Sequence, residues 1–234
     1  VVMLTTTPRI APGMILRMYG ARELDQSEAP GLYAVMNELA ERAGLAKAPM
    51  LYYIPSKVMN AFSVGNRQGS AIAISDGIVR YLNWREIAGV LGHEFGHIRN
   101  NDLRIYSLAD MLSRVTSAFS LIGQLLIVVY LPVWFFTHQG IPVLIIMILF
   151  FAPSMSTLMQ LALSRTREFA ADLAAVELTG DSQGLAGALM KMEQYQSRFW
   201  ETLFLPGRKV PEPSVLRTHP HSAERIERLR MLGE

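Results

Sequence analysis

The stretch His93-Glu94-Phe95-Gly96-His97 lies inside a segment, 84–98, whose apolar periodicity predicts an α-helix. Residues four apart share one face of a helix, so both imidazoles would project to the same side. Two neutral imidazoles at that spacing can bind one Zn²⁺, and a glutamate beside them can take a proton from water. The stretch therefore predicts a zinc peptidase in which His93 and His97 bind the metal and Glu94 is the general base.

The flanks of this segment carry helix signals. Asn83 is a good N-cap, and Glu86 three residues later can complete a capping box. Gly92 and Gly96 cost helix stability but would allow another backbone to approach closely. The polar run 100–102 is suited to ending the helix.

Composition restricts the class of protein. Half of the 234 residues are hydrophobic and 18% are charged, against about 25% charged in ordinary soluble proteins. The net charge of +2 gives no reason to expect a nucleic-acid partner. The chain has no cysteine, which excludes thiolate catalysis, disulfides and cysteine-based zinc sites.

The shortage of charge is concentrated in one region. Residues 115–164 contain no Asp, Glu, Lys or Arg, and this run divides into apolar segments 118–136 and 141–163 around a short turn, 137–140. Each segment is long enough to cross a hydrocarbon core about 30 Å thick. We expect a transmembrane helical hairpin in a lipid bilayer. The alternative, a buried hairpin of a soluble protein, leaves too little other chain to cover both helices.

Basic residues flank the hairpin and predict its orientation. Arg104 and Arg114 precede it, Arg165 and Arg167 follow it, and the turn between the two segments contains neither Lys nor Arg. By the positive-inside rule both flanks face the cytoplasm. We therefore expect a multi-pass protein of the cell (inner) membrane whose catalytic part is cytoplasmic.

A zinc peptidase site needs a third protein ligand, and a hairpin brings residues after 163 back to the side of the histidines. The HExxHxxGxxH pattern is excluded because Leu103 occupies its last position. The first acid after the hairpin is Glu168, four residues before Asp172, on a helix that Ser164 or Thr166 would cap. We expect Glu168 to bind the metal and Asp172 to accept the second N–H of a ligating histidine.

Other interpretations of these residues remain open at this stage. Glu168 and Asp172 are also compatible with a solvated pair of helix carboxylates. His138 would fall on the far side of the membrane, and His219 and His221 have a spacing that is not typical of ligands on one helix. These three histidines are weaker candidates as ligands.

At this point the sequence resembles the HtpX family of membrane zinc metallopeptidases, which are relatives of the CAAX prenyl proteases. The resemblance covers nearly the whole chain. One departure is His221, where the family has a second proline, and another is the absence of the family's amino-terminal spans, so we expect a part of a longer protein. The segments that carry the resemblance are 18–21, 60–65, the His93–His97 motif, 168–172, 218–221 and 225–226.

The resemblance implies an α+β, mainly helical, zincin-like fold with a small sheet and the hairpin inserted. Composition predicts strands 61–64 and 71–75 joined by a turn, and strand 61–64 would be an edge on which extended substrate pairs. Asn60, Ala61 and Phe62 would bind the substrate backbone, His219 would donate to the oxyanion, and Arg225 would face the same cleft. The alternatives are a turn-forming Asn60, a surface turn at His219 and a solvated basic helix at Arg225.

The predicted organisation has four parts. They are a juxtamembrane lead-in (1–26), the first part of the catalytic domain (27–114), the transmembrane hairpin (115–164) and the second part of the catalytic domain (165–234). Within them we expect helices at 30–43, 184–200 and 223–232, a strand at 50–54 and a loop at 201–217.

The predicted function is zinc-dependent hydrolysis of peptide bonds in extended polypeptides. The family resemblance implies misfolded or membrane-protein substrates and a role in quality control, and the oligomeric state stays undetermined. The alternatives are a selective processing protease of the CAAX prenyl type and a non-catalytic scaffold in which zinc only fastens helices together.

Overall fold

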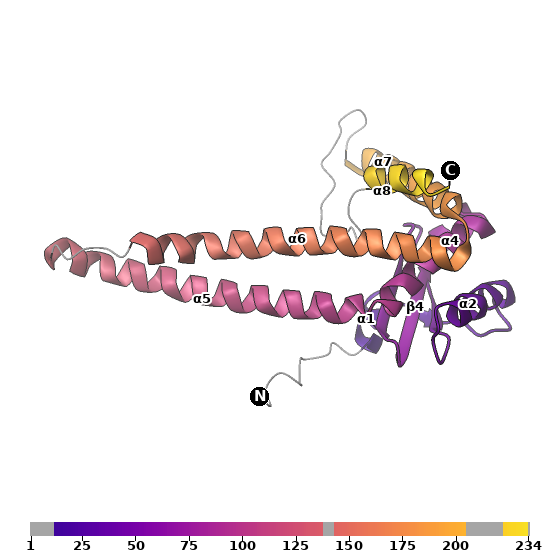
Figure 1. Ribbon diagram of the computed structural model, residues 1–234, viewed down its shortest axis with the longest axis horizontal. Helices are drawn as coiled ribbons and strands as arrows, with labels where there is room; N and C mark the ends of the chain where they lie inside the picture. The colour runs from indigo at the N-terminus through magenta and orange to yellow at the C-terminus, as the bar shows by residue number, and fades with distance from the viewer. Residues whose placement is uncertain (1–11, 138–142, 205–221, 234) are drawn as a thin grey trace. The chain divides into compact units, whose positions relative to one another are not determined.

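The computed structural model describes residues 12–137, 143–204 and 222–233, which divide into two compact units (Figure 1). The first unit, here called the catalytic unit, comes from residues 1–103 and 167–234, and the second, the hairpin unit, is residues 104–166. The expectation of a mainly helical chain with a small sheet is confirmed. The hairpin unit begins at 104 and ends at 166, whereas the sequence analysis placed its limits at 115 and 164.

The catalytic unit contains a four-stranded mixed sheet. Its order is β1 (Arg22–Glu23), β2 (Met50–Ile54), β4 (Gly69–Ser75) and β3 (Ala61–Asn66). The central β2 and β4 are parallel, whereas β1 and β3 pair antiparallel with their neighbours. The β3–β4 hairpin is longer than predicted because the strands continue to a turn at 67–68. Because β3 stands last in the strand order, it is an edge strand, as expected.

Alternate residues of the sheet pack into two apolar layers. Ile72 and Ile74 face a large core that also contains Leu91 and Phe95 of the histidine helix. Ala71 and Ala73 face a smaller cluster with Leu16. This alternation is the period of two expected for a strand covered on both faces.

Residues 12–26 form part of this packing. α1 (Pro12–Met18) contributes its buried Leu16 to the smaller cluster, and Tyr19 contacts the ring of Phe62 with centroids 4.9 Å apart. β1 extends the sheet. The described part of the predicted juxtamembrane lead-in is thus a layer of the catalytic unit.

Among the described residues, five further helices lie wholly within the catalytic unit. The histidine helix, α4 (Trp84–Arg99), has the predicted capping box: the Asn83 side chain accepts from the Glu86 backbone, and the Glu86 carboxylate accepts from the Asn83 backbone. Residues 201–204 are helical and end α7 (Ser182–Phe204), so the predicted loop does not begin at residue 201, and the rest of that prediction lies outside the described residues. The helices are α2 (Pro30–Arg42), α3 (Asp76–Tyr81), α4 (Trp84–Arg99), α7 (Ser182–Phe204) and α8 (Ser222–Met231).

Glycines on α4 allow other helices to approach it closely. A Cβ on Gly92 would stand 3.0 Å from Thr179 Cγ2, and one on Gly89 would stand 2.6 Å from the backbone nitrogen of Leu185. The predicted reason for Gly92 is therefore present in the structure. Gly89 makes a closer approach that the sequence analysis did not anticipate.

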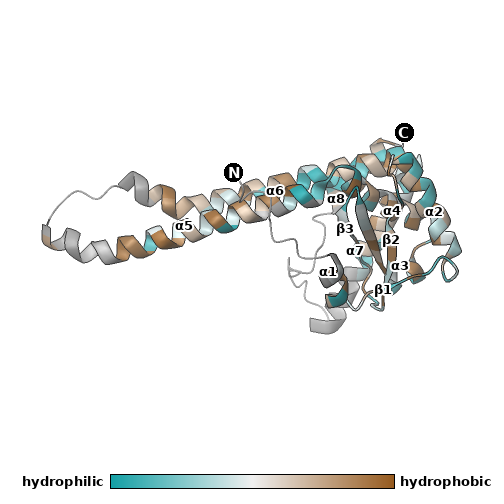
Figure 2. Ribbon diagram, turned by 90° about the horizontal axis from the view of Figure 1, so that it is seen from below, coloured by the Kyte–Doolittle hydropathy of each residue, from teal (hydrophilic) through white to brown (hydrophobic). Residues whose placement is uncertain are grey.

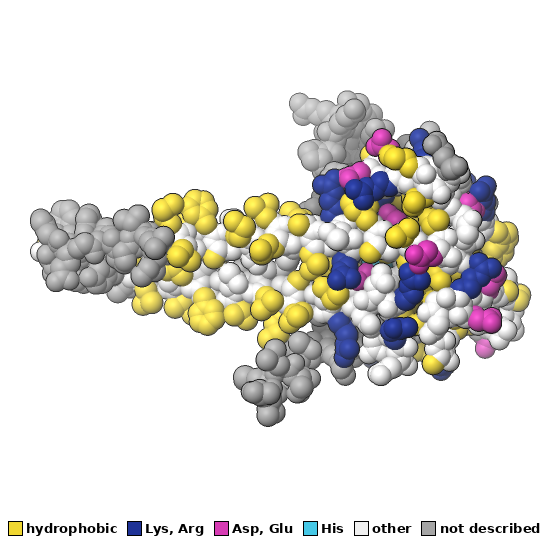
Figure 3. Space-filling view, in the orientation of Figure 1, with side chains coloured by type: hydrophobic (Ala, Val, Ile, Leu, Met, Phe, Trp, Pro, Cys, Tyr) yellow, Lys and Arg dark blue, Asp and Glu magenta, His cyan; other side chains and the backbone are white. Residues whose placement is uncertain are grey.

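Two long helices, α5 (Asp102–Thr137) and α6 (Val143–Thr179), contain the uncharged run. Within them, 104–128 and 147–179 are long and apolar enough to cross a membrane, and 6% and 0% of their most apolar windows are buried in the structure. Figure 3 shows apolar side chains spread over the surface of both helices, and Figure 2 shows the hydropathy of the ribbon. The described residues of this chain do not cover these helices, which disfavours a buried hairpin.

The predicted helix start at Ser164 or Thr166 is wrong, because α6 runs through both residues. The Thr166 hydroxyl donates to the carbonyl oxygen of Ala162, 2.9 Å away, as a threonine inside a helix does. The segment after the uncharged run is thus a continuation of the second apolar helix.

Polar side chains join the two helices within the hairpin unit. The hydroxyls of Ser113 and Ser156 are 2.5 Å apart, and the amide of Gln160 donates to the carbonyl oxygen of Ala109 at 3.0 Å. Ser120 donates to the carbonyl oxygen of Leu149. Such contacts join helices where the surroundings offer few other polar partners.

Candidate metal centre

The two histidines of α4 lie one helical turn apart and point to the same place. Their side chains are buried, with the ring planes at 84° and the centroids 4.7 Å apart. The Nε2 atoms are 3.2 Å from each other. The geometry is the one that the four-residue spacing predicts.

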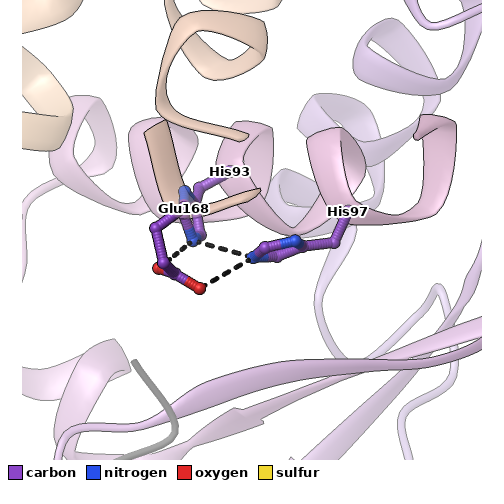
Figure 4. Close-up of side chains that lie close together, drawn as sticks. All are labelled: His93, His97 and Glu168. Carbon is purple, nitrogen blue, oxygen red and sulfur yellow. Dashed lines mark hydrogen bonds and ion pairs between the residues drawn. The ribbon is translucent and has the colours of Figure 1, made fainter. Parts of the chain in front are cut away.

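Glu168 brings its carboxylate from α6 to the same point (Figure 4). Its oxygens lie 3.5 Å from His93 Nε2 and 3.6 Å from His97 Nε2, and the side chain is 4% exposed. Around an ion bound tetrahedrally at about 2.0–2.1 Å, neighbouring ligand atoms stand about 3.3–3.4 Å apart. The three side chains therefore fit one small divalent cation, and the structure brings together the three residues that the sequence analysis selected.

Carboxylates hold the opposite nitrogens of both rings. Asp172 Oδ1 lies 2.9 Å from His93 Nδ1, and Asp102 Oδ2 lies 2.8 Å from His97 Nδ1. These contacts assign the Nδ1–H tautomer to neutral rings, so both Nε2 atoms present lone pairs to the same point. Two lone pairs 3.2 Å apart repel, and a cation between them removes the repulsion. The orientation of both Nε2 lone pairs toward one point is thus what a metal centre requires.

Asp172 takes the position that the sequence analysis proposed for it, whereas Asp102 was missed. Asp102 was interpreted only as a helix-ending residue. Asn101 adopts a left-handed conformation with φ 55°, which turns the chain between α4 and α5. The first residue of α5 then faces back toward His97. The available signal was Asn101 directly before Asp102, because asparagine tolerates the left-handed conformation that such a turn requires.

Arg225 of α8 is buried among the same acids. Its Nε and Nη2 donate to Asp172 at 2.7 and 2.6 Å, and Nη1 lies 2.9 Å from Glu168 Oε2. Burial lowers the pKa of Arg225, but its hydrogen bond to Asp172 and the nearby carboxylate charges outweigh this and raise it. The sequence analysis expected Arg225 to face the substrate cleft. In the structure its guanidinium holds one metal-binding candidate, Glu168, and the acid behind another, Asp172.

Opposing influences also act on His93. Burial and the charge of Arg225 lower its pKa, whereas hydrogen bonds to Asp172 and Glu168 raise it, and the net direction is upward. A positive charge on the ring is therefore favoured by the surrounding carboxylates. The same surroundings attract a metal cation.

Glu94 follows His93 on α4 and is buried, with 2% of its surface exposed. Its charge is among those that raise the pKa of Arg225. The proposed general base is thus a buried residue of α4, next in sequence to one of the candidate metal ligands.

The predicted substrate strand is β3. Ala61 and Phe62 are buried on opposite faces of the sheet, so only their backbone is available for pairing. The backbone of Asn60 is held by Ser75: its N–H donates to Ser75 Oγ at 2.9 Å, and its carbonyl accepts from Ser75 N at 3.0 Å. His219 lies outside the described residues.

Comparisons with known proteins show which family and which relatives this chain is similar to. The model of "Peptidase family M48" matches residues 26–232. A "Protease HtpX homolog" of Thermococcus kodakarensis is 34% identical over 94% of this chain and 80% of its own length, and one of Acaryochloris marina is 36% identical over 94% and 78%. The crystal structure of S. mikatae Ste24p aligns with 97% of this chain at a TM-score of 0.52 and 22% identity. The chain spans about half (54%) of that structure, which is similar in fold.

Proposed function

Because the chain belongs to peptidase family M48, we propose that it is a zinc-dependent endopeptidase that cleaves extended polypeptides at a membrane. Membership of the family and the two apolar helices support a membrane metalloprotease. The observation that carries the proposal is the buried group His93, His97 and Glu168, whose donor atoms all lie within 4.8 Å of one another. Two imidazoles and one carboxylate are a usual ligand set of catalytic zinc.

The chemistry follows from the residues around this group. Zinc held there would polarise the scissile carbonyl and acidify the attacking water. Glu94 takes the proton of that water on its carboxylate and delivers it to the leaving nitrogen. The buried carboxylates of Asp102 and Asp172 keep the imidazoles in the orientation that this chemistry needs.

Substrate would bind as an additional strand along β3. One side of β3 pairs with β4, and an extended peptide can hydrogen-bond to the other side through its backbone. We place the Asn60 side chain and the backbone of Ala61 and Phe62 in this contact. His219 would donate to the oxyanion of the tetrahedral intermediate. A folded segment cannot align with a strand, so the expected substrates are unfolded or damaged polypeptides, membrane proteins included.

The hairpin would cross the membrane with both ends on the cytoplasmic side. The arginines that flank the uncharged run support this orientation. A role in protein quality control follows from unfolded substrates close to a membrane. Processing of prenylated carboxyl termini is the other specificity that the same chemistry allows.

The test is digestion of casein in detergent by the parent and by Glu94→Gln. The parent should cleave casein and lose activity with a chelator, whereas Glu94→Gln should bind zinc and be at least about a hundredfold slower. A Glu94→Gln variant that cleaves at the parent rate would refute the assignment, and no cleavage by a zinc-loaded parent would favour a scaffold. A parallel prenylated peptide separates broad cleavage from terminal processing.

A further inference from the structure

Asp102 links the candidate metal centre to the start of the apolar hairpin. It is the first residue of α5 and is fully buried, with 0% of its surface exposed. One oxygen lies 2.8 Å from His97 Nδ1, and the other lies 3.2 Å from Arg167 Nη1. A buried carboxylate needs such partners for both oxygens, because an uncompensated charge is costly to bury.

Arg167 stands at the other end of the hairpin. The hairpin unit covers residues 104–166, so Asp102 and Arg167 belong to the catalytic unit on either side of it. Arg167 also directly precedes Glu168, the candidate third ligand. One ion pair therefore connects the partner of His97 to the backbone that carries Glu168.

The second imidazole is supported in the same way. His93 Nδ1 contacts Asp172, and Asp172 is in turn fixed by Arg225 of α8. Each histidine thus contacts a carboxylate, and each carboxylate contacts an arginine from a distant part of the chain. The two arginines differ in burial: the side chain of Arg225 is 4% exposed and that of Arg167 is 30% exposed.

We propose that Asp102 is a positioning residue for His97 and that Arg167 holds Asp102 in place, so that closure of the hairpin base tunes the affinity of the metal centre. The carboxylate can orient the imidazole only while the arginine keeps it at its buried position. Drawing the two ends of the hairpin apart would release Asp102 and loosen His97. This inference rests on the metal-binding part of the proposed function.

The test measures metal binding by the full chain in detergent, with Glu94→Gln present throughout so that proteolysis plays no part. Arg167→Gln is compared with Arg167→Lys, which keeps the charge, and with Arg99→Gln. Arg99 is a matched control, because its side chain is 29% exposed and it also forms an ion pair with α6. It pairs at 2.7 Å with Glu177, which lies on α6 as Arg167 does. Zinc affinity is measured by chelator competition, and the site is observed through the visible spectrum of bound Co²⁺.

Arg167→Gln should weaken zinc binding about tenfold and change the Co²⁺ spectrum, as loss of a partner behind a ligand does. Arg167→Lys should restore most of the affinity, and Arg99→Gln should match the parent. Equal affinity and spectra for Arg167→Gln and Arg99→Gln would overturn the proposal. Should Arg167→Gln not fold, Asp102→Asn carries the same test, and unchanged zinc binding there overturns it. A parent that binds no zinc would instead contradict the proposed function.

Discussion

Gly96 lies in van der Waals contact with the backbone of Ala171, so that a Cβ on Gly96 would stand 3.0 Å from both the Cα and the carbonyl oxygen of Ala171. Ala171 follows Glu168 by three residues on α6. This contact sets the distance between the helix that carries the two histidines and the helix that carries the candidate third ligand. A larger side chain at position 96 would therefore separate the ligands.

Gly96→Ala should destabilise the protein and weaken zinc binding together. Alanine favours a helix over glycine by about 1 kcal/mol, but overpacking against backbone costs about 1–3 kcal/mol. The control is Gly13→Ala in α1, where a Cβ would meet nothing within 4 Å. Thermal unfolding and chelator competition measure both effects. A Gly96→Ala variant as stable as Gly13→Ala would show that α6 yields easily.

Arg225→Ala should destabilise the metal-free protein by about 3–5 kcal/mol, because it leaves the buried carboxylates of Asp172 and Glu168 without their cation. Added zinc should recover part of the loss. Arg228→Ala on the same helix is the control, since its guanidinium stacks over Phe169 at 3.8 Å on an exposed surface. Calorimetry measures the loss. A residue that only binds substrate would instead raise KM and leave stability unchanged.

The ion pair of Arg85 and Asp181 predicts a pH effect on stability. The hydrogen bond from Arg85 lowers the pKa of Asp181, so its contribution is present above the unfolded pKa of about 3.9 and is lost as pH falls through the lower folded value. Asp181 also accepts from Gly184 N at 3.0 Å at the start of α7. Asp181→Asn should keep this cap, lose up to about 1 kcal/mol at neutral pH and flatten the stability profile below about pH 5.

Chemical unfolding of the parent and of Asp181→Asn between pH 3 and pH 7, spanning the reference pKa of about 3.9, measures this difference. Asp181→Ala serves as the control for the cap and should lose about 1 kcal/mol more, independently of pH. Parallel pH profiles of the parent and the asparagine variant would contradict the prediction.

Removal of the metal should lower the unfolding temperature. Zinc at a hundred times its Kd stabilises the folded state by about 2.7 kcal/mol, and a chelator should remove that stabilisation reversibly. Glu168→Gln is the control, because a site without its carboxylate should gain little from zinc. Differential scanning fluorimetry in detergent measures the shift. A shift of the same size in Glu168→Gln would place the zinc elsewhere.

The absence of cysteine makes the orientation of the hairpin directly measurable. In intact cells or right-side-out vesicles, Gln139→Cys in the predicted external turn should react with a membrane-impermeant maleimide. Gln68→Cys, in the β3–β4 turn of the catalytic unit, should react only after permeabilisation. The reverse pattern would invert the proposed orientation.

The parts of the site that local sequence signals encode were predictable. The capping box of α4 and the four-residue spacing of His93 and His97 depend only on neighbouring residues. Glu168 could be selected because a hairpin must return the chain to its starting side. Its contact with the histidines could therefore be predicted without knowing how the strands of the sheet are arranged.

The parts that depend on tertiary contacts were missed. Thr166 has the same side chain whether it caps a helix or donates back inside one, so the continuity of α6 was not evident. From the sequence, Asp102 is expected at an exposed helix end. In the structure the left-handed conformation of Asn101 turns the chain, and Asp102 is buried. Arg225 looks like part of a solvated helix until Asp172 and Glu168 lie beside it.

The pairing of Asp102 with Arg167 has a consequence for the replacement of the hairpin unit by another segment. The ion pair of Asp102 and Arg167 joins the residues of the catalytic unit that flank segment 104–166. A short loop could therefore connect these two residues without a change in the packing of the core. If the proposed function holds, exchanging residues 104–166 for a short water-soluble connector should release the metal site from the bilayer while the ion pair that closes the base is kept.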